Sequence, residues 1–217
     1  MEGHSVYYTE ATSGSQPIKF GAMTSTTGTS PGAPPLRADA RRNRDRLLAA
    51  ATTAFAEHGA DAPLEDIARQ AGVGIGTLYR HFPTRLALQE GVFRSQVETV
   101  CDHGRELADA PSAGDAFAAW LRVMGGFLVT KRGLSHALIA TLGKDSELIS
   151  SCSQVLRATA ERLLDRAQQA GAVRQDVTAM DVMRLIHGIT MATEQAPEES
   201  ERLLSLMLDG LKARPAG

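Results

Sequence analysis

Residues 64–82, with the sequence LEDIARQAGVGIGTLYRHF, constrain the fold of this chain more than any other stretch. Apolar residues at helical spacing begin the segment. Three glycines, Gly72, Gly74 and Gly76, then fall within five positions, before an aromatic and basic run. Two structures contain glycine clusters of this kind: a loop that cradles phosphate after a strand, or a tight turn between two short helices.

The phosphate-loop alternative fails on both spacing and context. A dinucleotide-binding loop needs glycine at its first, third and sixth positions, directly after a strand. Counted from Gly72 the sixth position is Thr77, and counted from Gly74 it is Tyr79. The preceding residues have helical periodicity, and the chain contains no Gly-Lys-Ser/Thr sequence. The segment therefore does not predict a nucleotide-binding loop.

The alternative with two helices accounts for several positions together. Gly72 stands where the first helix must end, and glycine adopts the positive φ of a C-terminal cap without strain. Val73 and Leu78 are placed to pack back against Ile67 and set the angle between the helices. The second helix, residues 75–81, is too short to be stable alone, so its role is to present side chains. This pattern predicts a helix-turn-helix whose second helix enters the major groove of DNA.

Helical periodicity recurs along the rest of the chain, and no useful run alternates with period two, so we predict an all-α fold of about nine helices. Residues 1–36 are rich in Ser, Thr, Gly and Pro and predict a disordered extension, of which 1–22 fit an upstream or cloning-derived segment. Residues 37–103 predict a three-helix DNA-binding domain, and residues 104–217 a helical ligand-binding and dimerisation domain. In the second domain we expect one helix ending near Gly133, and further helices at 134–142, 148–170, 180–191 and 198–211.

Composition excludes several other classes of protein. The 217 residues carry a formal net charge of −2, so only a local basic face would bind DNA. Two cysteines without CxxC spacing and six histidines without HExxH spacing predict neither a metal site nor a disulfide framework. No apolar run reaches the length of a membrane span, and no signal peptide is evident, which favours a cytoplasmic protein without a membrane partner. With no GxSxG sequence and no cofactor motif, we expect no enzyme activity and no cofactor.

The same residues closely resemble the TetR family of transcriptional regulators. The resemblance rests on an arginine-rich first helix, on AAATTAFAEHG at 49–59, on the 64–82 segment, and on PTRLAL at 83–88. The resemblance is strong over residues 41–100. Over the remainder it extends only to the number of helices and the general character of the sequence. Two positions depart from the family pattern: Pro63 stands where a Ser or Thr cap is common, and Arg85 where a Lys is usual. The resemblance implies a homodimer that binds a palindromic operator in double-stranded DNA.

Within the predicted DNA-binding domain, the residues fall into two roles. Ile75, Gly76 and Thr77 begin the second helix, where side chains meet base edges. Tyr79, His81 and Arg85 are better placed for phosphates, as are the arginines of the first helix, which also suit a minor groove. Alternatives stay open: Thr77 as a helix cap, Tyr79 as a packing residue, and the arginines as a solvated helix start. The candidate DNA-binding residues are Arg41, Arg42, Arg44, Ile75, Gly76, Thr77, Tyr79, Arg80, His81, Thr84 and Arg85.

Two further sets are expected in the C-terminal domain. An aromatic and sulfur-rich helical stripe, with polar or soft groups nearby, suits an apolar pocket, although core packing is the favoured explanation for each residue taken singly. The ligand-binding candidates are Trp120, Met124, Phe127, Leu128, His136, Thr141, Cys152 and His187. The last two helices carry more apolar surface than a lone hairpin needs, which predicts a four-helix dimer interface. The interface candidates are Met180, Leu185, Gly188, Ile189, Leu203, Leu206 and Met207.

The sequence thus predicts a DNA-binding regulator, most simply a repressor, that is released by a small and mainly apolar or aromatic molecule. Two alternatives remain. The first is a constitutive DNA-binding regulator with a solid core around Trp120. The second is a helical dimeric adaptor in which the helix-turn-helix is a relict. The adaptor would not bind DNA, so a DNA-binding measurement distinguishes it from the others. The constitutive regulator would bind DNA but would not respond to an effector.

Overall fold

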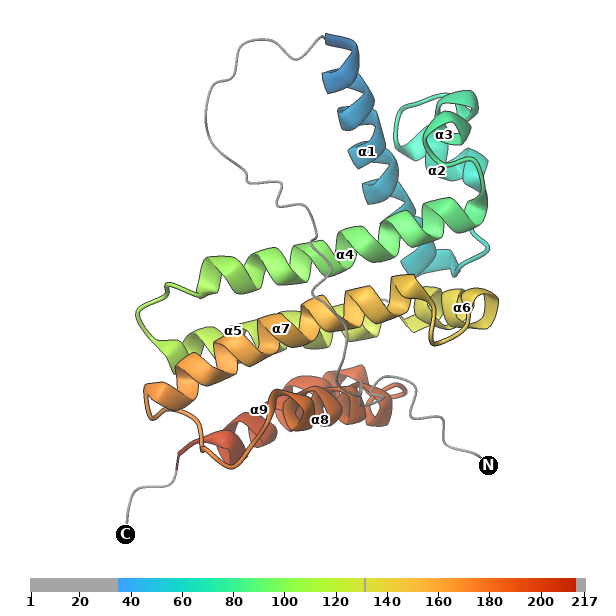
Figure 1. The fold of residues 1–217 in the computed structure, drawn as a ribbon. Coiled ribbons are helices and arrows are strands. Elements are labelled where there is room, and N and C mark those ends of the chain that lie inside the picture. Colours follow the sequence, from blue (N-terminus) through green and yellow to red (C-terminus); the bar gives the residue numbers. More distant parts are fainter. Residues whose placement is uncertain (1–34, 131, 214–217) are drawn as a thin grey trace.

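A computed structural model of the chain describes residues 35–130 and 132–213, and within them it contains nine α-helices (Figure 1). The predicted all-α fold is confirmed. The predicted extension, residues 1–36, lies outside the described residues except for its last two, which begin the first helix. The helices are α1 Pro35–His58, α2 Leu64–Gln70, α3 Ile75–His81, α4 Arg85–Leu107, α5 Ala113–Thr130, α6 Arg132–Leu142, α7 Glu147–Gln169, α8 Ala179–Ala192 and α9 Ser200–Leu211, with a 3₁₀ turn at Pro197–Glu199.

The helices stack in layers along one direction (Figure 1). At one end, α2 and α3 pack beside α1, and α4 crosses beneath them. Next, α5 and α7 run alongside α4, and α8 with α9 covers the far side of this pair. α4 packs against α1 as well as against α5 and α7. The predicted boundary between 103 and 104 falls inside α4, so this helix belongs to both parts of the molecule.

Glycines end several helices because only glycine takes a positive φ without strain. Gly72, expected to end a helix, has a φ angle of 67°, and Gly59 and Gly171, which also follow helices, have φ angles of 77° and 68°. The expectation for Gly133 is wrong. α5 ends at Thr130, and Gly133 is the second residue of α6. A glycine near a helix start carries no positive φ requirement, so its position alone does not reveal on which side the helix lies.

Side-chain caps begin other helices. Thr84 caps α4 and accepts a hydrogen bond from the Ala87 amide at 3.0 Å. At the start of α8, Thr178 and Asp181 form a reciprocal capping box, each side chain bonding to the other residue's backbone amide. The Thr178 hydroxyl also donates to the Asp181 carboxylate at 2.7 Å, and this bond together with that from the Thr178 amide holds the pKa of the carboxyl below its usual value.

α4, α5 and α7 pack closely together at Gly104. A Cβ on Gly104 would stand 2.4 Å from Thr159 Cγ2 and 3.0 Å from Trp120 Nε1, so only glycine fits between these helices. Trp120 is fully buried, and its indole N–H donates to the Val100 carbonyl of α4 at 3.1 Å. The buried indole is therefore hydrogen-bonded as well as packed, which fixes α5 against α4.

Candidate DNA-binding surface

The turn between α2 and α3 is closed by backbone hydrogen bonds around Gly72. The Gly72 amide donates to the Arg69 carbonyl at 3.0 Å, and the Val73 amide donates to the Ala68 carbonyl at 3.0 Å. Ile67 and Leu78 are fully buried beneath the turn. α2 begins at Pro63 without a side-chain cap, as its sequence indicates. The backbone and one apolar contact therefore set the angle of the helix-turn-helix.

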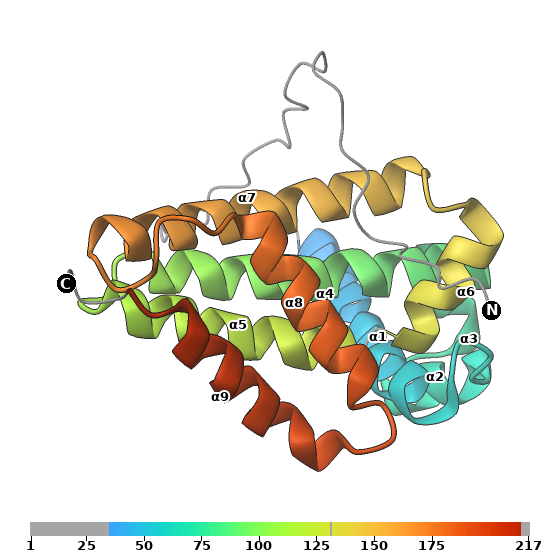
Figure 2. The ribbon, with the colours of Figure 1, turned by 90° about the horizontal axis from the view of Figure 1, so that it is seen from below.

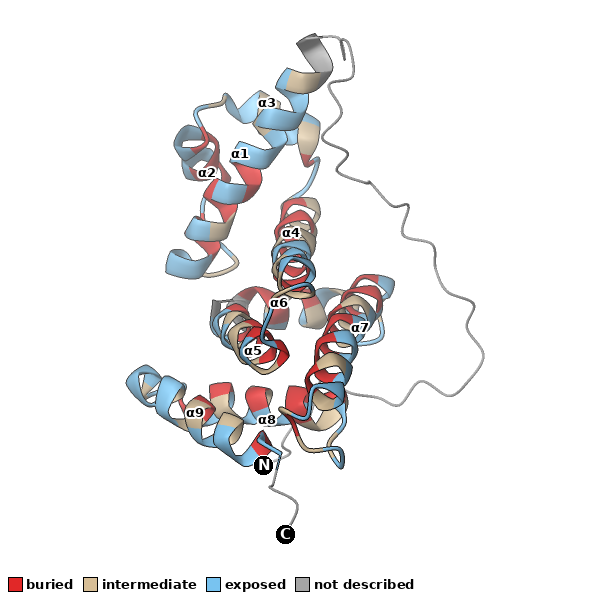
Figure 3. Cartoon of the chain, turned by 90° about the vertical axis from the view of Figure 1, so that its left-hand side faces the viewer, coloured by how far each residue is buried: buried red, intermediate tan, exposed pale blue. Residues whose placement is uncertain are grey.

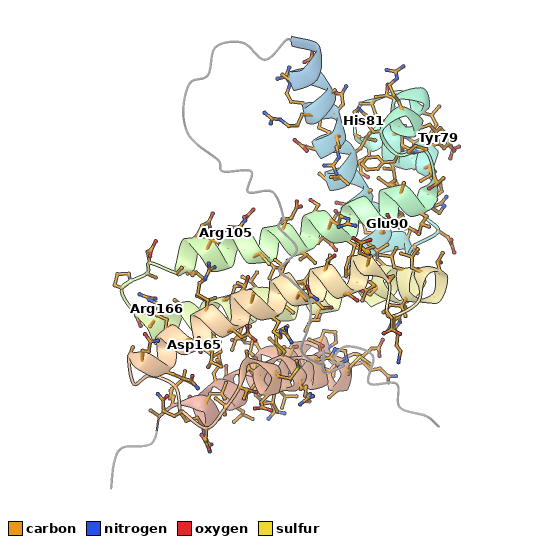
Figure 4. All side chains as sticks on the ribbon, in the orientation of Figure 1. Tyr79, His81, Glu90, Arg105, Asp165 and Arg166 are labelled. Atoms are coloured by element: carbon orange, nitrogen blue, oxygen red, sulfur yellow. The ribbon has the colours of Figure 1, made fainter. Side chains whose placement is uncertain are left out.

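α3 directs most of its side chains away from the domain. Leu78 is its one buried residue, whereas Ile75 is 37% exposed and Tyr79, four positions later on the same face, is 46% exposed. A Cβ on Gly76 would meet no atom within 4 Å, so the protein itself does not require glycine there. Figure 4 shows Tyr79 and His81 on this outer helix, remote from the C-terminal helices. The face is neither needed for packing nor covered by any described segment.

The arginines of α1 differ in how they are held. The Arg44 guanidinium lies over the Phe82 ring, 5.7 Å from its centroid, directly after α3. Arg42 is paired with Asp39 on the exposed start of α1, and Arg41 is exposed. Arg46, which was not among the candidates, lies closest to the turn: its Nη1 is 3.6 Å from where a Cβ on Gly72 would be. The sequence shows Arg46 as one of five arginines, and only the crossing of α1 over the turn distinguishes it.

Two side chains at the start of α4 bind the loop between α1 and α2. Arg85 Nη1 donates to the Ala62 carbonyl at 2.5 Å and to the Ala60 carbonyl at 3.3 Å. Gln89 Nε2 donates to the same Ala60 carbonyl at 2.8 Å. Arg85 is half-buried in this contact, so its guanidinium has a structural role that competes with the predicted phosphate contact. Thr84 is likewise committed to capping α4.

α4 is also packed tightly into the DNA-binding domain at Gly91. A Cβ there would stand 2.9 Å from Phe82 Cε1 and 3.1 Å from Leu48 Cδ2. Phe82 directly follows α3, and Leu48 lies on α1. α4 therefore moves with the helix-turn-helix at one end and with Trp120 and Thr159 at the other. A shift of the C-terminal helices that carries α4 with it would move α3 as well.

Comparison with known proteins agrees with this geometry. The model of "Bacterial regulatory proteins, tetR family" matches residues 47–92, and that of "Transcriptional regulator SbtR-like, C-terminal domain" matches residues 112–213. The crystal structure of the TetR transcriptional regulator SCO0520 from Streptomyces coelicolor is 38% identical, with a TM-score of 0.72, over 79% of this chain and 99% of that one. The chain belongs to the TetR family of transcriptional regulators.

A second TetR structure, from Mycobacterium vanbaalenii, is 37% identical over 82% of this chain and 100% of that chain, with a TM-score of 0.66. An HTH-type transcriptional regulator of Staphylococcus aureus is 33% identical over 75 residues, which span 40% of its length and 34% of this chain. TetR-family members are DNA-binding transcription factors, so the chain is not an enzyme. In the described residues, no helix is long and apolar enough to span a bilayer, and no His, Cys, Asp or Glu cluster suits a metal ion.

The eight ligand-binding candidates of the TetR-type C-terminal domain differ in burial. Trp120, Met124, Phe127 and Leu128 on α5 are buried, as is Cys152 on α7. His187 on α8 is partly buried. His136 and Thr141 are exposed on α6, where the Thr141 hydroxyl donates to the Ala137 carbonyl at 2.9 Å. The structure therefore does not bring these two together with the buried five, because α6 turns that face outward.

The dimer candidates of this TetR-family chain lie on the outermost layer. α8 and α9 cross on one side of the bundle in Figure 2, and their outer faces are largely exposed in Figure 3. Leu185 is 48% exposed and Leu206 57%, while a Cβ on Gly188 would meet nothing within 4 Å. Met180, Ile189, Leu203 and Met207 are partly buried. Met191, 44% exposed on α8, adds to this apolar surface, although its sequence position did not single it out.

Proposed function

We propose that the chain is a homodimeric repressor that binds a palindromic operator through α3 of each subunit and is released by a small apolar molecule. The outward face of α3 carries the proposal. Ile75 and Tyr79 are large apolar side chains left exposed four residues apart, on a helix that buries only Leu78. Ile75 can contact the apolar thymine methyl groups of the major groove, and the Tyr79 hydroxyl can donate to a phosphate. Gly76 adds no side chain to this face and so permits close approach.

Binding to DNA is tested by titrating the full-length protein with mixed genomic fragments and sequencing those retained. Thr77→Ala should then relax preference at particular base pairs by about 1–3 kcal/mol if a base contact is present. Tyr79→Phe should instead weaken binding to all sequences, because a phosphate contact carries no sequence information. Thr141→Ala, an exposed threonine on α6, is the matched control. Retention of no fragment at low salt would support the adaptor alternative and reject the proposal.

Dimerisation through α8 and α9 is supported by the exposed apolar side chains of Leu185, Met191 and Leu206. Light scattering at micromolar concentration should give twice the subunit mass. Gly188→Ala adds a methyl group that meets no atom of its own subunit. It should weaken dimerisation about fivefold if two helices cross there, because the added methyl needs roughly 1 kcal/mol of rearrangement. Gly126→Ala on α5, equally open, should leave the dimer unchanged.

The effector class is supported by the charges of the interior. None of the buried residues in the described part of the chain is Lys or Arg. A polyanionic metabolite would lose its hydration there without gaining a counter-charge. An apolar compound would instead shift the population toward a spacing of the two α3 helices that does not fit DNA. DNA release by apolar compounds and not by phosphorylated metabolites is the expected result. A complex that no compound releases would support the constitutive alternative.

A further inference from the structure

A groove of about 610 Å³ lies where α1, α4 and α5 meet, between the DNA-binding helices and the C-terminal bundle. Figure 3 shows α1 and α5 on the same side of α4, with α8 and α9 beyond α5 and away from α1. The groove therefore stays open in a dimer formed through α8 and α9. Its volume falls within the range of small-molecule sites. The lining includes Asp45, Leu48, Thr52, Gln96, Thr99 and Phe127.

The apolar part of the groove comes from three helices. Leu48 of α1 and Phe127 of α5 are almost fully buried, and so is Val100 of α4, whose carbonyl accepts the Trp120 indole N–H. These side chains would cover one face of a hydrocarbon or aromatic ligand. They also connect the groove to both tight contacts of α4, because Leu48 packs at Gly91 and Trp120 at Gly104.

Several oxygen atoms along the groove can accept hydrogen bonds. Gln96 Oε1 is buried and has no hydrogen-bond partner. The Thr52 and Thr99 hydroxyls donate to the Leu48 and Ser95 carbonyls of their own helices, which leaves their oxygens free to accept. Asp45 adds an exposed carboxylate that forms no ion pair within the described part of the chain. No Lys, Arg or His lines the groove.

We propose that this junction groove is an effector site for a small amine, a molecule with an apolar body and a positively charged N–H donor group. The ammonium group would donate to Gln96 Oε1 and neutralise the Asp45 charge, while the apolar body covers Leu48 and Phe127. A buried carbonyl oxygen without a donor is costly to the protein, and a bound N–H group removes that cost. A carboxylate or phosphate ligand would meet the like charge of Asp45 and no cationic side chain.

Ligand binding in the groove is coupled to DNA binding. This coupling rests on the repressor function proposed above. The ligand touches α1 of the DNA-binding domain and α5 of the bundle, so it binds only one relative placement of the two. Fixing that placement lowers affinity for operator DNA, and by linkage DNA lowers affinity for the amine by the same factor.

The test compares three probes with one apolar body: 4-phenylbutylamine, 4-phenyl-1-butanol and 4-phenylbutyrate. Binding to the full-length protein without DNA is followed by NMR, using the side-chain amide of Gln96 as the local signal. Dissociation constants in the millimolar range are expected of fragments this small. The amine should bind about threefold more tightly than the alcohol, the effect of one partly exposed ion pair, and the carboxylate most weakly.

Variants separate the two polar contacts. Asp45→Asn should abolish the preference for the amine over the alcohol and leave the alcohol unchanged. Gln96→Met should weaken the amine and the alcohol about fivefold, since both donate to the lost oxygen. Gln96→Met should also raise the melting temperature of the free protein, because a buried unpaired oxygen is removed. Asp109→Asn, an exposed carboxylate after α4, is the matched control and should change none of these values.

Equal affinity for the three probes, or an amine preference that survives Asp45→Asn, overturns the site. An amine affinity that falls as protein concentration rises also overturns it, because a second copy of the chain would then occupy the groove. Amine binding that leaves operator affinity unchanged or raises it overturns the coupling. Failure of the protein to bind any DNA overturns the repressor proposal, while the binding data without DNA still decide the groove.

Discussion

Each end of α4 has a glycine where it crosses other helices. The side chains packed against the two glycines differ in how freely they can move. At Gly91 the atoms nearest a Cβ are the rim of the Phe82 ring and a terminal methyl of Leu48, at 2.9 and 3.1 Å. At Gly104 they are the Cγ2 of β-branched Thr159, at 2.4 Å, and the hydrogen-bonded indole of Trp120. Leucine and phenylalanine ends can shift by rotation, whereas Thr159 and Trp120 are held by their own hydrogen bonds. The DNA-binding end should therefore tolerate more change than the bundle end.

Among the variants proposed here, Gly104→Ala should cause the largest loss in the free energy of unfolding. The added methyl cannot be accommodated without moving α7 or Trp120, so we expect a loss of about 2–3 kcal/mol in the free energy of unfolding. Urea denaturation at fixed protein concentration measures it. Gly126→Ala, whose Cβ would meet nothing within 4 Å, should instead be neutral or stabilising by up to about 1 kcal/mol. Equal stabilities for both variants would contradict the tight crossing.

Arg85→Ala tests whether hydrogen bonds reinforce the DNA-binding end. Removing the guanidinium leaves the Ala62 carbonyl without its donor, which should cost about 1–2 kcal/mol of unfolding free energy. A phosphate contact would add a second effect, a lower dependence of DNA affinity on salt by about one unit of slope. Tyr79→Phe is the control for DNA binding without the structural contact. Lower stability with an unchanged salt slope would assign Arg85 to the loop alone.

Gly91→Ala should change the stability only slightly, because the steric cost of the added methyl group and its gain in helix propensity nearly balance. We expect destabilisation of about 1 kcal/mol or less, clearly below that of Gly104→Ala. Operator affinity should fall, since Phe82 must move and it directly follows α3. Unfolding curves and fluorescence anisotropy with operator DNA measure the two effects. A larger loss of stability than at Gly104 would reverse the proposed order of stiffness.

The smallest effect is expected at the α8 cap. The hydrogen bonds from Thr178 lower the pKa of Asp181, so the folded state favours the ionised carboxyl. The resulting stability is present above the unfolded pKa of about 4 and is lost as pH falls through the lower folded pKa. Asp181→Asn should flatten the acid side of the stability profile between about pH 5 and 3. Because the group is exposed, a steep change there would contradict this explanation.

Local patterns in the sequence were sufficient where neighbours along the chain decide the structure. Leu47, Leu48 and Ala51, which stand at helical spacing in the sequence, form a buried face of α1. Thr84 caps α4, and Gly72 ends α2 in the conformation that its position requires. Each of these features depends on atoms within one or two helical turns, so composition and spacing carry the information. The helix-turn-helix could be predicted for the same reason.

The sequence by itself thus determined the helices, the turn between α2 and α3, and membership in a family of DNA-binding regulators. Tertiary packing alone decided what covers each helical face. Periodicity could not show that α6 turns His136 outward, that Arg85 reaches the loop carbonyls, or that α1, α4 and α5 enclose a groove around Gln96. These outcomes depend on how helices distant in the chain cross, and a crossing is set by both partners together.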